Sequence, residues 1–113
     1  MADADTTRRT IPAAAVPVGG GTIVAAHGVV VTQPSAGVFV AFSATCTHLG
    51  CTVRAVAGGT INCFCHGSRF RITDGSVAGG PAPRPLPRVT LTVADGLIEL
   101  GPPPSAARAD RPG

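Results

Sequence analysis

The chain has 113 residues, which suits one small domain and is too short for two. Only 13% of the residues are charged, and the net charge of +3 is the balance of nine arginines against six acidic residues. The chain has no lysine, and never more than two arginines are adjacent. Four Phe with no Trp or Tyr provide no stacking platform for single-stranded nucleic acid, so nucleic-acid binding is disfavoured. Fifteen Gly and eleven Pro among 44% hydrophobic residues favour a loop-rich, all-β domain.

Both ends of the chain are expected to lie outside the folded domain. Residues 1–18 begin with a polar stretch, and the apolar run that follows is interrupted by Pro12 and Pro17, which predicts a flexible N-terminal segment. This run is far shorter than a membrane-spanning helix and is a poor signal-peptide core, so no membrane span is expected. Residues 102–113, rich in Pro, Ala and Arg, are predicted to be disordered.

Short extended segments separated by turn residues follow one another along the chain, and none shows a helical apolar stripe. They lie at residues 22–25, 29–31, 38–42, 69–73, 76–77, 89–93 and 97–100. His27 falls in the first predicted turn and is expected to be a solvated surface residue. Asp74-Gly75 and Asp95-Gly96 are typical hairpin turns. The fold class predicted is all-β with antiparallel strands.

Two six-residue segments between the strands concentrate the residues that can carry chemistry. We call them the first box, Cys46-Thr47-His48-Leu49-Gly50-Cys51, and the second box, Cys63-Phe64-Cys65-His66-Gly67-Ser68. Two disulfides would leave the two histidines unexplained. A Cys2His2 zinc site is chemically possible but would leave two cysteines idle. An iron–sulfur site with two cysteine and two histidine ligands, in which the other two cysteines form a disulfide, uses all four cysteines and both histidines. Spacing alone does not decide which cysteine of each box is a ligand.

The two boxes resemble those of Rieske iron–sulfur proteins, specifically the disulfide-containing type of cytochrome bc complexes. In such centres two histidines replace two cysteines on one iron of a [2Fe–2S] cluster. The resemblance extends over about 80 residues, and it includes Gly80-Pro81-Ala82-Pro83, followed by Arg84-Pro85-Leu86, as counterpart of the loop that covers the cluster. The chain also looks like small stand-alone actinobacterial Rieske proteins.

The resemblance implies a ligand set and a fold. One [2Fe–2S] cluster per chain is expected on Cys46, His48, Cys63 and His66, and a disulfide is expected between Cys51 and Cys65. Ser68 matches a serine whose hydroxyl donates to a cluster sulfur. A Rieske domain at residues 19–101 is expected to contain a cluster-binding subdomain at about residues 44–83.

This ligand set explains the expected redox chemistry. Two thiolates and two neutral imidazoles leave the oxidised cluster without net charge, so an electron enters more easily than with four thiolates. Rieske centres accordingly span roughly −150 to +300 mV, against about −400 mV for plant-type ferredoxins. The second nitrogen of each histidine adds a proton site coupled to reduction. Phe70 stands where high-potential members carry Tyr, which predicts a potential below that of respiratory Rieske subunits.

The function implied is electron transfer, in the manner of the iron–sulfur subunit of a cytochrome bc1 complex in a respiratory chain. Alternatives are a small subunit of an arsenite-oxidase-like molybdenum enzyme, a Rieske-type ferredoxin, which generally lacks the extra cysteine pair, and a non-redox zinc module. By itself the chain would be an electron carrier; in a complex it would serve an oxidoreductase of the quinol–cytochrome c reductase type. The expected partners are a cytochrome b or c type protein or a molybdenum subunit, and quinol.

The disulfide favours an oxidising, extracytoplasmic setting, at the outer face of the cell membrane through a partner or a removed leader. Arg8-Arg9 matches a twin-arginine leader only in part, since no hydrophobic region follows. Leu49 corresponds to an apolar residue at the quinone-facing tip of bc-type proteins, or serves as a cover for the cluster. Arg69 and Arg71 flank Phe70 in a strand and are expected to face solvent rather than to dock a partner.

Overall fold

The computed structural model describes residues 10–45, 52–63, 67–80, 82 and 84–101. This part of the chain is almost entirely β-structure, as expected, with every strand pairing antiparallel. Its elements are β1 (Thr10–Pro12), the short 3-10 helix η1 (Ala13–Ala15), β2 (Gly20–Val24), the 3-10 helix η2 (Ala25–His27), β3 (Val29–Ser35), β4 (Val38–Ser43), β5 (Ala55–Ala57), β6 (Thr60–Asn62), β7 (Arg69–Arg71), β8 (Val77–Gly79), β9 (Arg88–Val89), β10 (Leu91–Ala94) and β11 (Leu97–Leu100).

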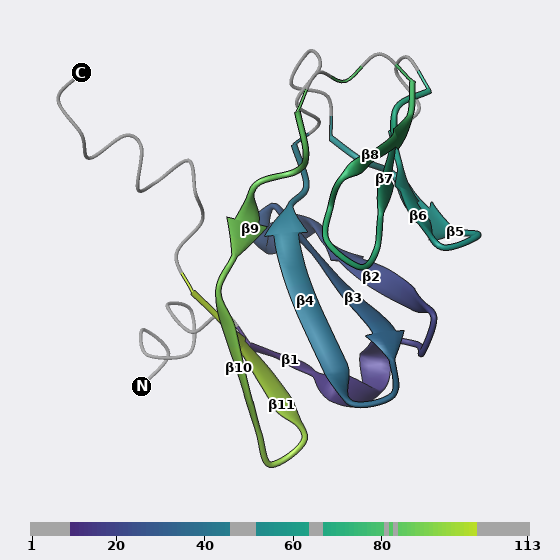
Figure 1. Ribbon diagram of the computed structural model, residues 1–113. Helices are drawn as coiled ribbons and strands as arrows, with labels where there is room; N and C mark the ends of the chain where they lie inside the picture. Colours follow the sequence, from purple (N-terminus) through teal and green to yellow (C-terminus); the bar gives the residue numbers. More distant parts are fainter. Residues whose placement is uncertain (1–9, 46–51, 64–66, 81, 83, 102–113) are drawn as a thin grey trace, which may run out of the picture.

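The strands form three sheets in two regions. The sheets β1-β11-β10 and β2-β3-β4-β9 make up the base, built from both ends of the described chain. The sheet β5-β6-β7-β8 lies between β4 and β9 in sequence, and we call residues 52–80 the inserted lobe. Figure 1 shows this lobe beside one end of the β2-β3-β4 sheet. The arrangement agrees with the expected subdomain inserted into a base of antiparallel strands.

The described end of the N-terminal segment belongs to the base. β1 pairs with β11 from Thr10 opposite Glu99 to Pro12 opposite Leu97. Val16 is 2% exposed and packs in the core of the base. The expectation of flexibility therefore does not hold for residues 10–16. Pro12 is tolerated because β1 is an edge strand, where a missing backbone N–H breaks no central ladder.

The strands β2 and β3 are longer than the β-branched runs of the sequence predicted. β2 begins at Gly20. The next position, Gly21, has no room for a side chain, because a Cβ there would lie 2.7 Å from the carbonyl oxygen of Val31 on β3. β3 continues to Ser35, with a bulge between Thr32 and Ser35. The strand expected at residues 38–42 is β4, which is fully buried at Phe42 but begins at an exposed Val38.

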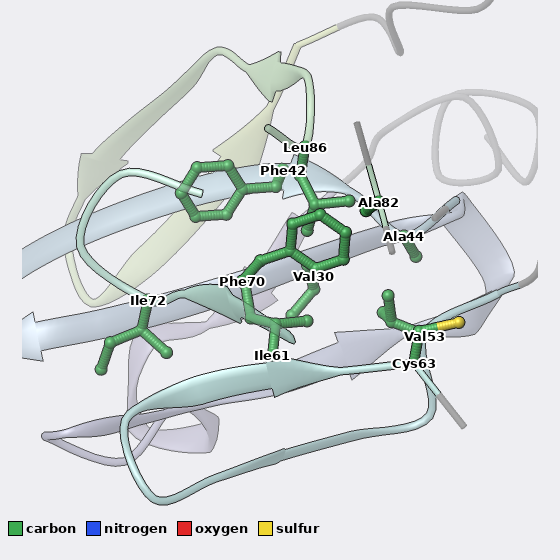
Figure 2. Packing of buried hydrophobic residues seen from close by; sticks show 10 residues of the cluster. All are labelled: Val30, Phe42, Ala44, Val53, Ile61, Cys63, Phe70, Ile72, Ala82 and Leu86. Carbon is green, nitrogen blue, oxygen red and sulfur yellow. The ribbon is translucent and has the colours of Figure 1, made fainter. Parts of the chain in front are cut away.

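The described residues form two hydrophobic cores. One lies within the base and contains Val29, Val31 and Ile98. The other joins the regions, because Val30 and Phe42 of the base pack with buried residues of the lobe (Figure 2). Its ten buried members are Val30, Phe42, Ala44, Val53, Ile61, Cys63, Phe70, Ile72, Ala82 and Leu86.

Buried hydrogen bonds strengthen this connection between base and lobe. The hydroxyl of Thr32, itself fully buried on β3, donates to the carbonyl oxygen of Ile72 at 2.8 Å. The backbone N–H of Leu86 donates to the carbonyl oxygen of Gly75 at 3.0 Å. The lobe is therefore anchored on the base through its β7–β8 side.

Candidate functional site

The first box is closed at its two ends by backbone pairing. Thr45 and Thr52 form an isolated antiparallel bridge, and the N–H of Val53 donates to the carbonyl oxygen of Ala44 at 2.7 Å. Ala44 and Val53 are each 1% exposed, so this closure is part of the shared core. The chain is thereby fixed where it enters and leaves the box.

The second box is closed in the same way. The N–H of Cys63 donates to the carbonyl oxygen of Ser68 at 2.9 Å, and β6 and β7 continue the hairpin below. Cys63 is 2% exposed and Ser68 is fully buried. Figure 2 shows Cys63 beside Val53 at one end of the shared core. The structure thus brings the ends of the two boxes together, although they are separated in sequence.

The hydroxyl of Ser68 indicates that an acceptor belongs at this site. It is buried, and it finds no hydrogen-bond partner among the residues that the structure describes. A buried unsatisfied hydroxyl costs about 1–3 kcal/mol, so such a group normally has an acceptor. A cluster sulfur beside Cys63 is an acceptor of the kind expected from the sequence. The residues present here fit a [2Fe–2S] group.

Gly80 holds the returning chain tightly against the second box. A Cβ at Gly80 would lie 2.5 Å from Cα of Ser68 and 2.6 Å from the carbonyl oxygen of Gly67, and its φ is +85°. Only glycine combines this close approach with a left-handed backbone. Ala82, from the expected covering loop, is buried in the shared core. The loop counterpart proposed from sequence therefore packs at this site where it is described.

Most of the expected site residues cannot be placed. Leu49 and the expected site residues Cys46, His48, Cys51, Cys65 and His66 lie outside the described residues, as do Pro81 and Pro83. Of the described residues, none form a group of three or more His, Cys, Asp or Glu side chains that could hold a metal ion. The ligand set and the disulfide therefore stay predictions, and the structure places Cys63 and Ser68.

The sequence did not predict the strands that lie next to Cys63 and Ser68. The strands β5 and β6 were not expected, although Thr60 and Asn62 alternate with the buried Ile61 after the turn at Gly58-Gly59. That alternation was the available signal, but three residues are too few to distinguish a strand from a loop. His27 lies in η2, the connection between the paired strands β2 and β3, as expected for a turn, but it is half-buried rather than fully solvated.

A family model for the Rieske [2Fe-2S] domain matches residues 10–90. The chain belongs to this Rieske family. The domain binds a [2Fe–2S] cluster, which agrees with the expected cofactor and with the donor set at the second box. The match begins at the first described residue of β1, consistent with the place of that strand in the base.

Curated proteins similar to this chain include Rieske subunits of larger complexes. The cytochrome b6-f complex iron-sulfur subunit of Chlorobaculum tepidum is 39% identical over 89 residues, 77% of this chain and 49% of its own. A Haloferax mediterranei protein provisionally named as the Rieske subunit of a respiratory nitrate reductase is 46% identical over 57 residues, 50% of this chain and 26% of its own. The chain thus spans from about a quarter to about half of these curated relatives.

Among solved structures, the plasma membrane Rieske protein PetC3 of Synechocystis is similar, with 35% identity and a TM-score of 0.60. The match covers 71% of this chain and 82% of that one. Across the described segments, no helix has the length and apolar character to cross a membrane. The fold and cofactor expected from the two boxes are thus confirmed.

Proposed function

We propose that this chain is an electron-transfer domain of the cytochrome bc type whose cluster is held by Cys46 and His48 of the first box and by Cys63 and His66 of the second. The observation that carries this proposal is the closed second box, which sets the buried Cys63 beside the unpartnered hydroxyl of Ser68. When bound, a cluster of this kind takes up and releases one electron, at roughly −150 to +300 mV.

The described residues support the site in distinct ways. Ser68 supplies a hydrogen-bond donor, and donors to a cluster sulfur stabilise the reduced, more negative state. Val53 and Ala44 exclude water beneath the boxes because both are buried in the shared core. Gly80 brings its backbone onto the second box, which limits solvent there.

A disulfide between Cys51 and Cys65 belongs to the same proposal. It would join the two boxes across a loop of about 15 residues and add roughly 3 kcal/mol by the chain-entropy estimate. It would also hold both histidine-bearing segments in place. We take residues 19–101 as the expected domain, with about residues 44–83 as the cluster-binding part, and the family match adds residues from 10 onward.

The partner proposed is a cytochrome-type or molybdenum-containing subunit of an oxidoreductase complex, with quinol as the electron source. The names of the curated relatives support membership of a complex, since they are called subunits of cytochrome b6-f and of a nitrate reductase. An extracytoplasmic position at the outer face of the membrane follows from the proposed disulfide.

Spectroscopy and metal analysis of the purified protein test this function. We expect two irons and two acid-labile sulfides per chain, a visible chromophore, and an EPR signal that appears on reduction by one electron. Cys63→Ala is expected to abolish the signal, whereas Ser68→Ala keeps the cluster and lowers its potential. A colourless protein with stoichiometric zinc would falsify the redox function.

The histidines offer a matched control. His48→Ala is expected to remove the Rieske EPR signal, and His27→Ala, which alters a histidine of η2 in the base, is expected to leave it unchanged. Equal loss in both variants would show that the histidine of the first box has no special role. Retention in both would remove His48 from the ligand set.

A further inference from the structure

The lobe sheet presents one face to the core and the other to solvent. Ile61 of β6 and Phe70 of β7 are fully buried opposite one another. Because successive strand residues alternate between faces, their neighbours lie on the outer face. This outer face carries Thr60, Asn62, Arg69 and Arg71, with Arg71 opposite Thr60 and Arg69 opposite Asn62. Both arginines are exposed, as the sequence predicted.

The two guanidinium groups are held along the sheet. Arg71 Nη1 donates to the carbonyl oxygen of Val77 at 3.0 Å and to the hydroxyl of Ser76 at 3.2 Å. Arg69 lies against the backbone of β8, since a Cβ at Gly79 would lie 2.8 Å from Arg69 Nη2. Side chains that are already ordered lose less conformational entropy when a partner binds.

A recess of about 600 Å³ opens on this face and extends to the second box. Its lining consists of Ala57, Gly58, Thr60, Asn62, Cys63, Gly67 and Arg69. Arg69 thus borders the same recess as Cys63, the candidate cluster ligand. A group that enters this recess contacts a cation and comes beside the expected redox centre.

The distribution of charge favours an acidic occupant. The lobe, residues 52–80, contains three arginines and one aspartate, a formal charge of +2. The described part of the base contains Arg88 on β9 and the acidic residues Asp95 and Glu99, a formal charge of −1. The three arginines of the lobe are Arg54, Arg69 and Arg71. Such asymmetry orients an approaching acidic surface toward the lobe.

We propose, on the basis of the electron-transfer function proposed above, that the outer face of β6 and β7 is the docking surface for the acidic face of a protein redox partner. A carboxylate of the partner is bound by the planar guanidinium of Arg69, which suits bidentate pairing. The recess then sets the partner beside Cys63, and one electron passes from the reduced protein to the oxidised partner. A nucleic acid fits less well, because aromatic residues are only 4% of the chain.

Binding to two purified c-type cytochromes, one acidic and one basic, tests this surface by titration calorimetry at about 20 mM and about 200 mM salt. The acidic cytochrome is expected to bind the oxidised protein more tightly at low salt. Arg69→Gln is expected to weaken this binding about fivefold to tenfold, and Arg69→Lys, which keeps the charge but not the fork, by less. Thermal unfolding of each variant checks that the lobe remains folded.

The matched control is Ser35→Glu, which changes the net charge by the same −1 at an exposed position of the base beside the β3–β4 turn. It is expected to change the affinity less than twofold. Equal weakening by both variants, preference for the basic cytochrome, or tighter binding of a single-stranded oligonucleotide would each overturn the docking surface. Binding does not require electron transfer. If a protein without an EPR signal still prefers the acidic cytochrome and is weakened by Arg69→Gln, the proposed function is wrong but the docking surface stands.

Discussion

The base and the inserted lobe are both antiparallel sheets, yet they are stabilised differently. The base has its own core, in which Val29, Val31 and Ile98 are fully buried. The lobe consists of three-residue strands, and its buried side chains pack on Val30 and Phe42 of the base. Short strands that bury at most one residue each cannot bury enough apolar surface alone. The lobe therefore depends on the base for its stability. The outer face of the lobe sheet and the end of the lobe at the second box remain available for function.

Close backbone contacts take the place of side-chain packing in the lobe, and Gly80→Ala is the severest test of this difference. The added Cβ would lie 2.5 Å from Cα of Ser68 at a φ of +85°, so neither the contact nor the backbone can relax cheaply. We expect a loss of more than about 3 kcal/mol in the free energy of unfolding, or loss of the cluster. Urea unfolding and EPR measure the two outcomes.

Gly59→Ala is the control for that variant. Gly59 has a similar φ of +80°, but a Cβ there meets nothing within 4 Å in the described structure. Its cost is expected to be the conformational part alone, about 1–2 kcal/mol. If Gly80→Ala were no more costly than Gly59→Ala, the tight contact with the second box would not contribute to the lobe.

The buried hydrogen bond between base and lobe is tested by Thr32→Val. This substitution keeps the shape of the side chain but removes the donor to the Ile72 carbonyl oxygen, 2.8 Å away and buried. An unsatisfied buried carbonyl costs about 1–3 kcal/mol. Hydrogen exchange should therefore speed up in the amides of β7 and β8 more than in those of β3 and β4.

Thr22→Val provides the matched change within the base. The Thr22 hydroxyl donates to the carbonyl oxygen of Ala15 at an exposed position, where water can replace it, so the effect is expected to stay below about 0.5 kcal/mol. A uniform rise in exchange across both regions in Thr32→Val would mean that the two regions unfold as one unit.

The base was more accessible to prediction than the lobe for a physical reason. The run Val29-Val30-Val31 and the alternation of Leu91 and Val93 with threonines mark strands directly, although the structure divides the strand expected at residues 89–93 into β9 and β10. β5 and β6 contain three residues each, and β1 includes a proline, so their pairing is set by tertiary contacts. The residue types of the boxes and their resemblance to Rieske proteins predicted an iron–sulfur site, but the burial of Cys63 and Ser68 required the fold.

The charge pattern shows the same limit. The sequence has no basic run, and Arg69 and Arg71 were expected only to face solvent. Pairing of β6 with β7 places Arg69 and Arg71 together on the exposed outer face of the lobe sheet. Long-range strand pairing, which no local pattern encodes, created that surface.

Phe70→Tyr tests whether the lobe core adjusts the redox centre. Phe70 is fully buried in the same core as Cys63, where a hydroxyl could donate to a sulfur ligand. A hydrogen bond of about 1 kcal/mol corresponds to roughly 40 mV for a one-electron couple, so protein-film voltammetry should show a rise of this order. Phe42→Tyr, also in this core but on β4 of the base, should not raise the potential. An unchanged midpoint in Phe70→Tyr would contradict a role for this position.

The smallest expected effect concerns Asp74 in the exposed turn between β7 and β8. Hydrogen bonds from the side chain and backbone of Ser76 lower the pKa of this carboxyl below its usual 3.8, and Arg71 and Arg88 add to the shift. A folded-state pKa below the unfolded value stabilises the protein above the unfolded pKa, and that stabilisation is lost as the pH falls through the folded pKa. Asp74→Asn should therefore lower the urea midpoint slightly at pH 7, with the difference shrinking below about pH 4. Asp95→Asn, in the β10–β11 turn of the base, measures the general effect of removing one carboxylate. A deficit in Asp74→Asn that persisted unchanged to pH 2.5 would assign it to altered turn geometry, because only the charged form is favoured by these neighbours.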